Sequence, residues 1–155
     1  MATADFRPTP YVQTTDVASN AISVNSAFIN VSGLVTNNET EQNSGITVAN
    51  VNIVTQGGVV IILGNFRATD FIVSSNAQAT VSLYRADSTT VQLNNQFAQI
   101  RLGSSTPIAA AQLVLPIFRI DAPPSGVNCY FVRAVSFPGS ALIDQRQLSA
   151  VEIRR

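Results

Sequence analysis

Apolar and polar residues alternate with a period of two along almost the whole sequence, and this pattern constrains the fold most. A β-strand turns successive side chains to opposite faces, so such alternation predicts strands with one buried and one exposed face. Val81 and Leu83 alternate with Thr80, Ser82 and Tyr84, for example, which predicts a hairpin strand with one wet face. Helical periodicity is hard to find, so the pattern predicts an all-β protein.

Segments of this kind recur at short intervals between turn residues, and Gly57-Gly58 is a tight-turn signal. The run 59–63 is apolar on both faces, so we expect a central strand covered by the second sheet and by a partner subunit or a long loop. Pro116 predicts an edge position or a bulge for its strand. The expected strands are 27–35, 46–55, 59–68, 79–86, 90–93, 96–102, 109–120, 127–137 and 148–153, with a surface loop at 36–45. Eight to ten antiparallel strands in 155 residues predict one jelly-roll-like β-sandwich.

The first 24 residues differ from the rest, because they are rich in polar residues and contain two prolines. Proline favours extended geometry and lacks a backbone donor, so residues 1–24 are interpreted as an extended N-terminal arm before a β-sandwich domain at 25–155. The predicted assembly arm carries Phe6, Pro8, Pro10, Tyr11 and Val12. Apolar anchors among polar neighbours favour packing on another subunit, and a disordered tail is the alternative.

Charge is scarce and balanced. Charged residues make up 12% of the chain, hydrophobic residues 46%, and nine basic residues meet nine acidic ones. Without a net positive field or a basic cluster, nucleic-acid binding is not expected. A monomer with so little charge leaves apolar patches in water, so we expect copies of the chain to associate as a trimer or a larger oligomer. No stretch reaches membrane-spanning length and no signal peptide is visible, so we expect no membrane insertion and synthesis in the cytoplasm.

Several kinds of reactive site lack their residues. There is no histidine, and lysine is absent too, which removes Ser-His-Asp arrangements and Schiff-base chemistry. The single cysteine, Cys129, rules out an internal disulfide and a cysteine metal cage, and its apolar neighbours predict a small buried side chain. Most of the carboxylates are expected in turns, in the arm or on exposed strand faces. The sequence contains no Asp-x-Asp or Asp-x-Asn cluster of the kind that binds calcium. We therefore expect no enzyme, no catalytic or metal site and no cofactor.

The segment Asp121 to Gly126 has the composition of a rigid structural turn. Asp121 can cap the turn through its carboxylate, Pro123 and Pro124 stiffen it, and Gly126 supplies permissive backbone angles. A backbone role thus accounts for each of these residues.

Three segments stand in an order that resembles a known group of proteins. They are the Gly-Gly turn with its apolar strand (57–63), Ser82 to Asp87, and Phe118 to Ala134, which contains Asp121-Ala122-Pro123-Pro124-Ser125-Gly126 and Tyr130. The last segment resembles a stretch of phage tail and appendage proteins that have a C1q/TNF-like jelly-roll sandwich. Arg146 to Ile153 is similar to the closing strand of that family. The resemblance implies a homotrimeric particle subunit.

These features lead to one main functional hypothesis. The chain is expected to be a non-enzymatic structural subunit of an extracellular or viral assembly, namely a tail, fibre or head-decoration component of a bacteriophage virion. Its expected partners are copies of itself, other structural proteins of the particle and a cell-surface glycan. One alternative is a carbohydrate-binding module, for which Tyr11, Tyr84 and Tyr130 are the scarce stacking platforms. Another is a surface protein of a bacterial spore or an extracellular filament.

Overall fold

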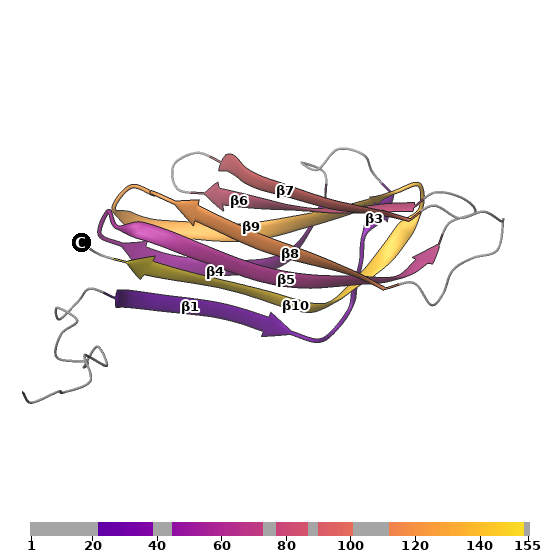
Figure 1. Cartoon of the computed structure of the whole chain (residues 1–155), viewed down its shortest axis with the longest axis horizontal. Coiled ribbons are helices and arrows are strands. Elements are labelled where there is room, and N and C mark those ends of the chain that lie inside the picture. Colours follow the sequence, from indigo (N-terminus) through magenta and orange to yellow (C-terminus); the bar gives the residue numbers. More distant parts are fainter. Residues whose placement is uncertain (1–21, 39–44, 73–76, 87–89, 101–111, 154–155) are drawn as a thin grey trace, which may run out of the picture.

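Every regular element in the described residues is a β-strand (Figure 1). The structure is a computed structural model that describes residues 22–38, 45–72, 77–86, 90–100 and 112–153. Five strands form sheet A, namely β1 (Ile22–Asn30), β2 (Leu34–Val35), β5 (Val59–Ile72), β8 (Leu113–Asp121) and β10 (Ser140–Ile153). Five more form sheet B, namely β3 (Asn37–Asn38), β4 (Ile46–Thr55), β6 (Ala77–Ala86), β7 (Thr90–Ile100) and β9 (Gly126–Phe137).

The chain passes repeatedly from one sheet to the other. Sheet A has the order β1-β10-β5-β8 with β2 beside β10, and sheet B has the order β3-β9-β6-β7 with β4 beside β9. From β4 onward, each strand is followed by a strand of the opposite sheet, except for the β6–β7 hairpin. This alternation is the topology of a jelly roll, so the predicted all-β, jelly-roll sandwich is confirmed. One detail differs from the wholly antiparallel expectation, because the two-residue strand β3 runs parallel to β9.

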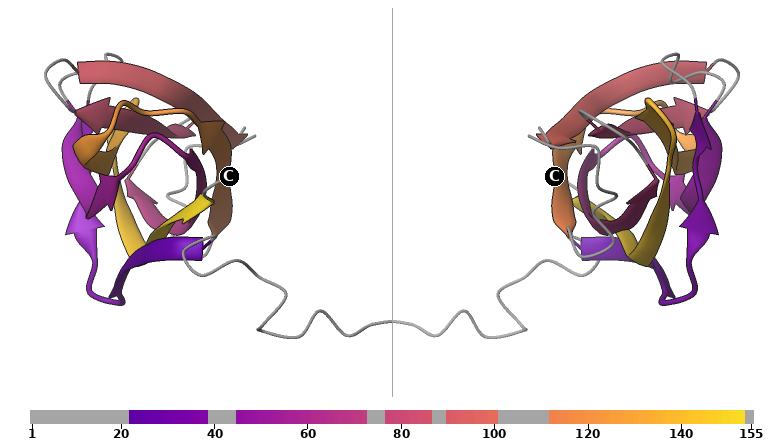
Figure 2. Two further views of the ribbon diagram at one scale, coloured as in Figure 1. Left: turned by 90° about the vertical axis from the view of Figure 1, so that its left-hand side faces the viewer. Right: turned by 90° about the vertical axis from the view of Figure 1, so that its right-hand side faces the viewer.

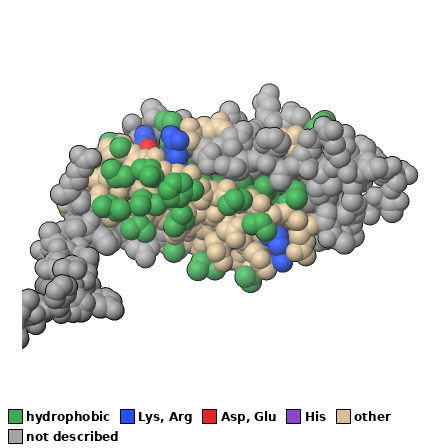
Figure 3. All heavy atoms as spheres, in the orientation of Figure 1, with side chains coloured by type: hydrophobic (Ala, Val, Ile, Leu, Met, Phe, Trp, Pro, Cys, Tyr) green, Lys and Arg blue, Asp and Glu red, His purple; other side chains and the backbone are tan. Residues whose placement is uncertain are grey.

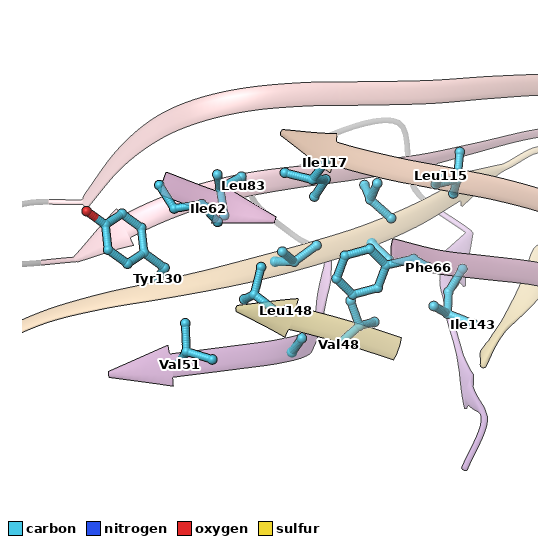
Figure 4. Packing of buried hydrophobic residues seen from close by; sticks show 14 of the residues in the cluster. Val48, Val51, Ile62, Phe66, Leu83, Leu115, Ile117, Tyr130, Ile143 and Leu148 are labelled. Carbon is cyan, nitrogen blue, oxygen red and sulfur yellow. The ribbon is translucent and has the colours of Figure 1, made fainter. Parts of the chain in front are cut away.

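The core lies between the two sheets and is built from the inward residues of both (Figure 4). Phe66 on β5 and Ile117 on β8 come from sheet A, and Leu83 on β6 comes from sheet B. The strands of both sheets surround this core when the molecule is viewed end-on (Figure 2). Burial of a large apolar side chain contributes about 1.5 to 3 kcal/mol, so these inward rows are the main source of stability.

The position of each strand in its sheet agrees with two expectations. Strand β5 lies between β10 and β8, as predicted for the apolar run 59–63. Strand β8, which contains Pro116, is the last strand of sheet A and pairs only with β5 in the described residues. Proline is tolerated there because an edge strand has a side without ladder hydrogen bonds.

The strand predicted at 27–35 is wrong in its bounds. Strand β1 runs from Ile22 to Asn30 and ends there, before β2 begins at Leu34. The strand is interrupted because the Asn30 side chain accepts hydrogen bonds from both the backbone N–H and the hydroxyl of Ser32, and this local turn competes with the hydrogen bonds of the sheet. The expected arm at 1–24 and its five anchor residues lie outside the described residues as far as residue 21, and residues 22–24 belong to β1.

Two further boundaries need correction. The segments 90–93 and 96–102 were predicted as separate strands, but residues 90–100 form the single strand β7. The closing strand was expected to begin at Leu148, but β10 begins at Ser140. The polar residues in the middle of β10 resemble a loop in the sequence. The strand is irregular between Asp144 and Gln147, where Gln145 has a φ of 46°.

The wet face predicted for β6 is also wrong. Thr80, Ser82 and Tyr84 are only 4%, 0% and 2% exposed, although they point away from the core. Tyr84 stacks on Phe131 of β9, with ring centroids 5.2 Å apart. The Arg133 guanidinium lies over both rings, 5.4 Å and 5.3 Å from their centroids. The outer side of sheet B is thus covered here by large side chains of its own strands.

Candidate assembly surface

The outer side of sheet A carries the main candidate surface, which we call the sheet A face. Its residues alternate along each strand with residues of the core. The sheet A face consists of Ala27 and Ile29 of β1, Val59, Ile61, Leu63 and Asn65 of β5, Val114, Pro116, Phe118 and Ile120 of β8, and Gln147, Ser149, Val151 and Ile153 of β10. Not one of these residues is ionisable.

Cross-strand register aligns these residues in rows. Ala27 is opposite Ser149, Ser149 is opposite Leu63, and Leu63 is opposite Phe118. In a second row, Ile61 is opposite both Val151 and Ile120. Same-face neighbours on paired strands lie in contact, so the rows form one continuous surface.

Large apolar side chains on this face are open to solvent. Phe118 is 61% exposed, Ile120 54% and Leu63 48%. Green hydrophobic side chains gather over the end of the sheet where β5 begins and β8 and β10 end (Figure 3). A contiguous apolar patch on a soluble protein marks an interaction surface. The second cover expected for β5 is therefore not supplied by the described part of this chain.

A groove of about 410 Å³ crosses the sheet A face from β1 to β8. Between the two outward rows that line it lies an inward row, in which Phe28, Leu148, Gly64 and Ile117 are successive cross-strand partners. Gly64 contributes no side chain, which keeps this part of the sheet thin. The groove lining contains no ionisable residue, so it suits an uncharged occupant.

An ion pair borders the sheet A face at Arg67 of β5, which is opposite Val114. Arg67 donates from Nε to Oδ1 of Asp144 over 2.7 Å and from a terminal nitrogen to the other carboxylate oxygen. The guanidinium holds the pKa of Asp144 below its ordinary value, mainly through these hydrogen bonds. The two charges neutralise each other, so the border adds little net charge to the face.

The predicted turn at Asp121 to Gly126 joins β8 to β9 and is tied to three strands. The Asp121 carboxylate accepts hydrogen bonds from Arg85 of β6 over 2.6 Å and from the Tyr130 hydroxyl of β9 over 2.9 Å. Burial and the adjacent carboxylate raise the pKa of Tyr130, so its hydroxyl remains a donor. Gly126 has a φ of 119°, in the region that favours glycine.

The prolines of this turn have different environments. Pro123 is buried, whereas Pro124 is exposed and uses its backbone carbonyl as an acceptor. That carbonyl receives hydrogen bonds from the Thr55 hydroxyl over 2.8 Å and from the Asn128 amide over 2.9 Å. The four turn residues named from the sequence thus lie together at one end of the sandwich. Whether the turn is rigid stays a prediction.

Glu152 contradicts the expectation of solvated carboxylates, because it is fully buried. Its Oε1 atom accepts hydrogen bonds from the backbone N–H groups of Gln56 and Gly58, over 2.8 Å and 2.9 Å. These donors belong to the turn between β4 and β5, so the carboxylate fixes a turn that lies nearly a hundred residues earlier in the sequence. A Cβ atom on Gly58 would lie 2.5 Å from the Ile153 carbonyl, which explains the glycine there.

Arg146 is a second polar residue that the sequence did not identify as buried. It is 5% exposed and donates to the backbone carbonyls of Val48 and Ser32, over 2.7 Å and 3.1 Å. Burial lowers its pKa. Cys129, by contrast, was expected to be buried but is only partly so, because it lies on the outer side of β9. Desolvation still raises the pKa of its thiol.

Metal sites and membrane-spanning helices are the two remaining features to consider in the described residues. Within the ranges that the structure describes, no three potential metal ligands cluster. No helix in that part of the chain is long and apolar enough to span a membrane.

No protein-family model matches the sequence, and no curated protein matches it either. Similar folds are found among solved structures. Eiger TNF from S. frugiperda aligns with 84% of this chain and 92% of its own chain, at 8% identity and a TM-score of 0.53. The globular domain of zebrafish complement 1qA protein aligns with 84% of this chain and 98% of its own, at 10% identity and a TM-score of 0.49.

A virus structure has the same kind of fold. The protein of infectious bursal virus derived T=1 particles aligns with 84% of this chain at 12% identity, with a TM-score of 0.50. The chain spans about a third of that virus protein, because 31% of the latter is covered. At identities this low the likeness shows the jelly-roll fold alone.

Proposed function

We propose that this protein is a non-enzymatic structural subunit of a bacteriophage virion, in its tail, a fibre or a head decoration, and that it associates with its own copies through the sheet A face. The observation that carries the proposal is the sheet A face, on which Phe118, Ile120 and Leu63 are 61%, 54% and 48% exposed. Burying such a surface is favourable by about 25 cal/mol for each Å² of apolar area.

The solved structures support this assignment at the level of fold. One neighbour forms virus-derived particles, so a jelly roll of this kind serves as a particle subunit elsewhere. The resemblance of the Asp121 to Tyr130 stretch to phage appendage proteins adds the phage context. A trimer is the proposed state, other structural proteins of the particle are the proposed further partners, and the virion is the proposed location.

The carbohydrate-binding alternative loses two of its platforms. Tyr84 is 2% exposed and Tyr130 is fully buried, so neither ring can stack on a sugar. Tyr11 lies outside the described residues. A glycan contact elsewhere on the particle subunit is compatible with the proposal, and a spore or filament surface protein would use the same apolar face.

Sedimentation velocity at micromolar concentration tests self-association. We expect the unaltered chain to form a species larger than the 16.5 kDa monomer, and the Phe118→Asp chain to remain a monomer because it places a carboxylate in the buried contact. Val127→Asp is the matched control, since Val127 is 67% exposed on sheet B. A monomeric unaltered chain would refute the proposal, and so would equal effects of the two substitutions.

The phage origin has its own test. Particles purified on a density gradient from a lysate are examined by mass spectrometry for peptides of this chain. We expect the peptides to co-sediment with virions, in a fixed ratio to the other structural proteins. Peptides found only in spore coats or filaments would replace the phage assignment by that alternative.

A further inference from the structure

The groove on the sheet A face has two walls of different character, and each wall takes one residue from each of four strands. Cross-strand register sets their order from β1 through β10 and β5 to β8. One wall consists of Ile29, Gln147, Asn65 and Pro116, and the other of Ala27, Ser149, Leu63 and Phe118. The first wall therefore has two exposed amides at its centre, and the second ends on an exposed aromatic ring.

This combination of groups suits an extended peptide. A polyproline II segment makes no internal hydrogen bonds, so its backbone carbonyls need donors from elsewhere. The side-chain amides of Asn65 and Gln147 carry such donors. Grooves lined by aromatic side chains bind proline-rich segments in this conformation, because the preformed backbone loses little entropy on binding. At the β8 end of the groove, Pro116 and Phe118 offer apolar rings against which prolines can pack.

We propose that the groove of one copy binds residues 8–12 of the N-terminal arm of a neighbouring copy, in polyproline II geometry. This inference rests on the proposed function, because the groove lies on the face through which copies are proposed to associate. The segment is Pro8-Thr9-Pro10-Tyr11-Val12, which lies outside the described residues. Its two prolines favour the extended geometry that the groove accepts.

The lengths of the groove and the segment agree. The groove crosses four neighbouring strands, so it is about 14 Å long at the usual strand spacing. Five residues of polyproline II span about 12 to 15 Å, at about 3.1 Å per residue. A five-residue segment therefore extends across the groove from β1 to β8.

The charge of the segment also matches the groove. No residue that lines the groove is ionised at neutral pH. Along the arm, residues 8–15 form an uncharged stretch between Arg7 and Asp16. A charged segment would lose its hydration in the groove without gaining a counter-ion, which is costly. The uncharged part of the arm, which contains both prolines, is therefore the part that fits.

The place where the arm joins the sandwich favours a neighbouring copy as the acceptor. The arm enters β1 at Ile22, which is opposite Ile153 at one end of sheet A. The groove is lined by Ala27 to Ile29, further along β1, so the arm would have to reverse its direction to reach the groove of its own chain. Residues 13–21 bridge up to about 33 Å when extended, which is enough to reach an adjacent copy.

Disulfide trapping on the full chain tests the contact. Cys129→Ser in every variant leaves one thiol per chain, placed in the arm by Thr9→Cys or in a groove wall by Ser149→Cys. Under mild oxidation, a 1:1 mixture is expected to give the disulfide between positions 9 and 149, identified by mass spectrometry of the linked peptides. Asn52→Cys, at an exposed position of sheet B, is the matched control. Its yield should be at least about tenfold lower, because docking raises the local concentration of the groove thiol around the arm.

Substitutions in the arm test the polyproline II geometry. Pro8→Gly with Pro10→Gly removes the backbone restriction, so it is expected to lower the yield of the mixed disulfide several-fold. Thr14→Gly with Thr15→Gly, outside the docked segment, is expected to leave the yield unchanged. Equal losses for the two pairs would overturn the docking of residues 8–12.

The outcomes separate this inference from the proposed function. An oligomeric unaltered chain whose arm thiol reacts equally with positions 149 and 52 overturns the docked arm and leaves the proposed function intact. A chain with both Thr9→Cys and Ser149→Cys that closes its disulfide within a monomer, while the mixture gives none, overturns the exchange between copies. A monomeric unaltered chain overturns both inferences. Circular dichroism checks that the Ser149→Cys chain folds, and Asn65→Cys replaces it if it does not.

Discussion

The outer sides of the two sheets have similar sequence patterns but different environments. On sheet B, Tyr84 points away from the core and is nonetheless buried, because Phe131 stacks on its ring and Arg133 covers both rings. On sheet A, Phe118 also points away from the core, yet it is 61% exposed. Around Tyr84 the outer side of sheet B is covered by side chains of its own strands, whereas the large apolar side chains of the sheet A face are left exposed. An outward aromatic residue therefore stabilises the fold in sheet B, and in the proposed assembly its counterpart in sheet A stabilises the contact between copies.

Alanine substitutions at these two aromatic residues test the contrast most strongly. Tyr84→Ala is expected to lower the free energy of unfolding by about 3 to 5 kcal/mol, as for a core aromatic residue. Phe118→Ala is expected to change it by less than about 0.5 kcal/mol, as for a surface position. Urea unfolding is measured at a protein concentration low enough to keep the chain monomeric. Equal losses at the two positions would mean that the outer sides do not differ as described.

The turn that carries the chain from sheet A to sheet B gives the next effect. Gly126 has a φ of 119°, so Gly126→Val is expected to destabilise the fold by about 1 to 3 kcal/mol through backbone strain. A Cβ atom at this position meets nothing within 4 Å, so crowding makes no contribution. Gly126→Asn is the control, because asparagine tolerates left-handed conformations better than valine. Unchanged thermal melting of the valine variant would show that the turn is not rigid.

Much of the fold could be predicted from the sequence where neighbours in the chain decide the structure. Strand β4 has the bounds predicted from alternation, 46–55, and Pro116 correctly indicated an edge strand. The burial of the outward face of β6 could not be predicted, because the cover over Tyr84 comes from Phe131 and Arg133, about 50 residues later. Glu152 was likewise misread as solvated, because its two partners are backbone groups of a distant turn. The Gly57-Gly58 pair was the signal available in the sequence, because a tight turn has backbone N–H groups that need an acceptor.

The sequence predicted that the protein has an apolar surface but not where on the fold that surface lies. Low charge and excess apolar composition indicated self-association, and the apolar run 59–63 indicated an extra cover for its strand. Composition does not say which rows meet, because Phe118 and Leu63 become neighbours only through the register of β5 and β8.

Removal of the arm tests whether the sheet A face suffices for assembly. A chain that begins at Ala21 is expected to keep its β-sheet circular dichroism and to associate about tenfold more weakly, equivalent to about 1.4 kcal/mol. The lost contribution is that of the predicted anchors Phe6, Tyr11 and Val12 on a neighbouring subunit. Light scattering follows the particle size. Assembly as strong as that of the full chain would show that the apolar face acts without the arm.

The smallest expected effect concerns the ion pair at the border of the sheet A face. Arg67 holds the folded pKa of Asp144 below its ordinary value of 3.8. The contribution of the pair to stability is therefore fully present above that ordinary value, and it is lost as pH falls further, through the lower folded pKa. The pair is partly exposed and screened by solvent, so we expect its contribution to be small. Urea unfolding between about pH 5 and pH 2 should therefore show a slightly smaller acid loss in Asp144→Asn than in the unaltered chain. An identical loss would show that the pair contributes nothing.

The central place of β10 has a consequence for biosynthesis. This strand pairs with β1, β2 and β5, and its Glu152 holds the turn between β4 and β5. A ribosome makes β1 and β5 long before β10, so their pairing with β10 has to wait until that strand has been made. Such non-local pairing makes folding slow, and the β10-facing edge of β5 stays unpaired until β10 emerges. A fragment that ends before β10 is therefore expected to expose unpaired apolar strands and to aggregate.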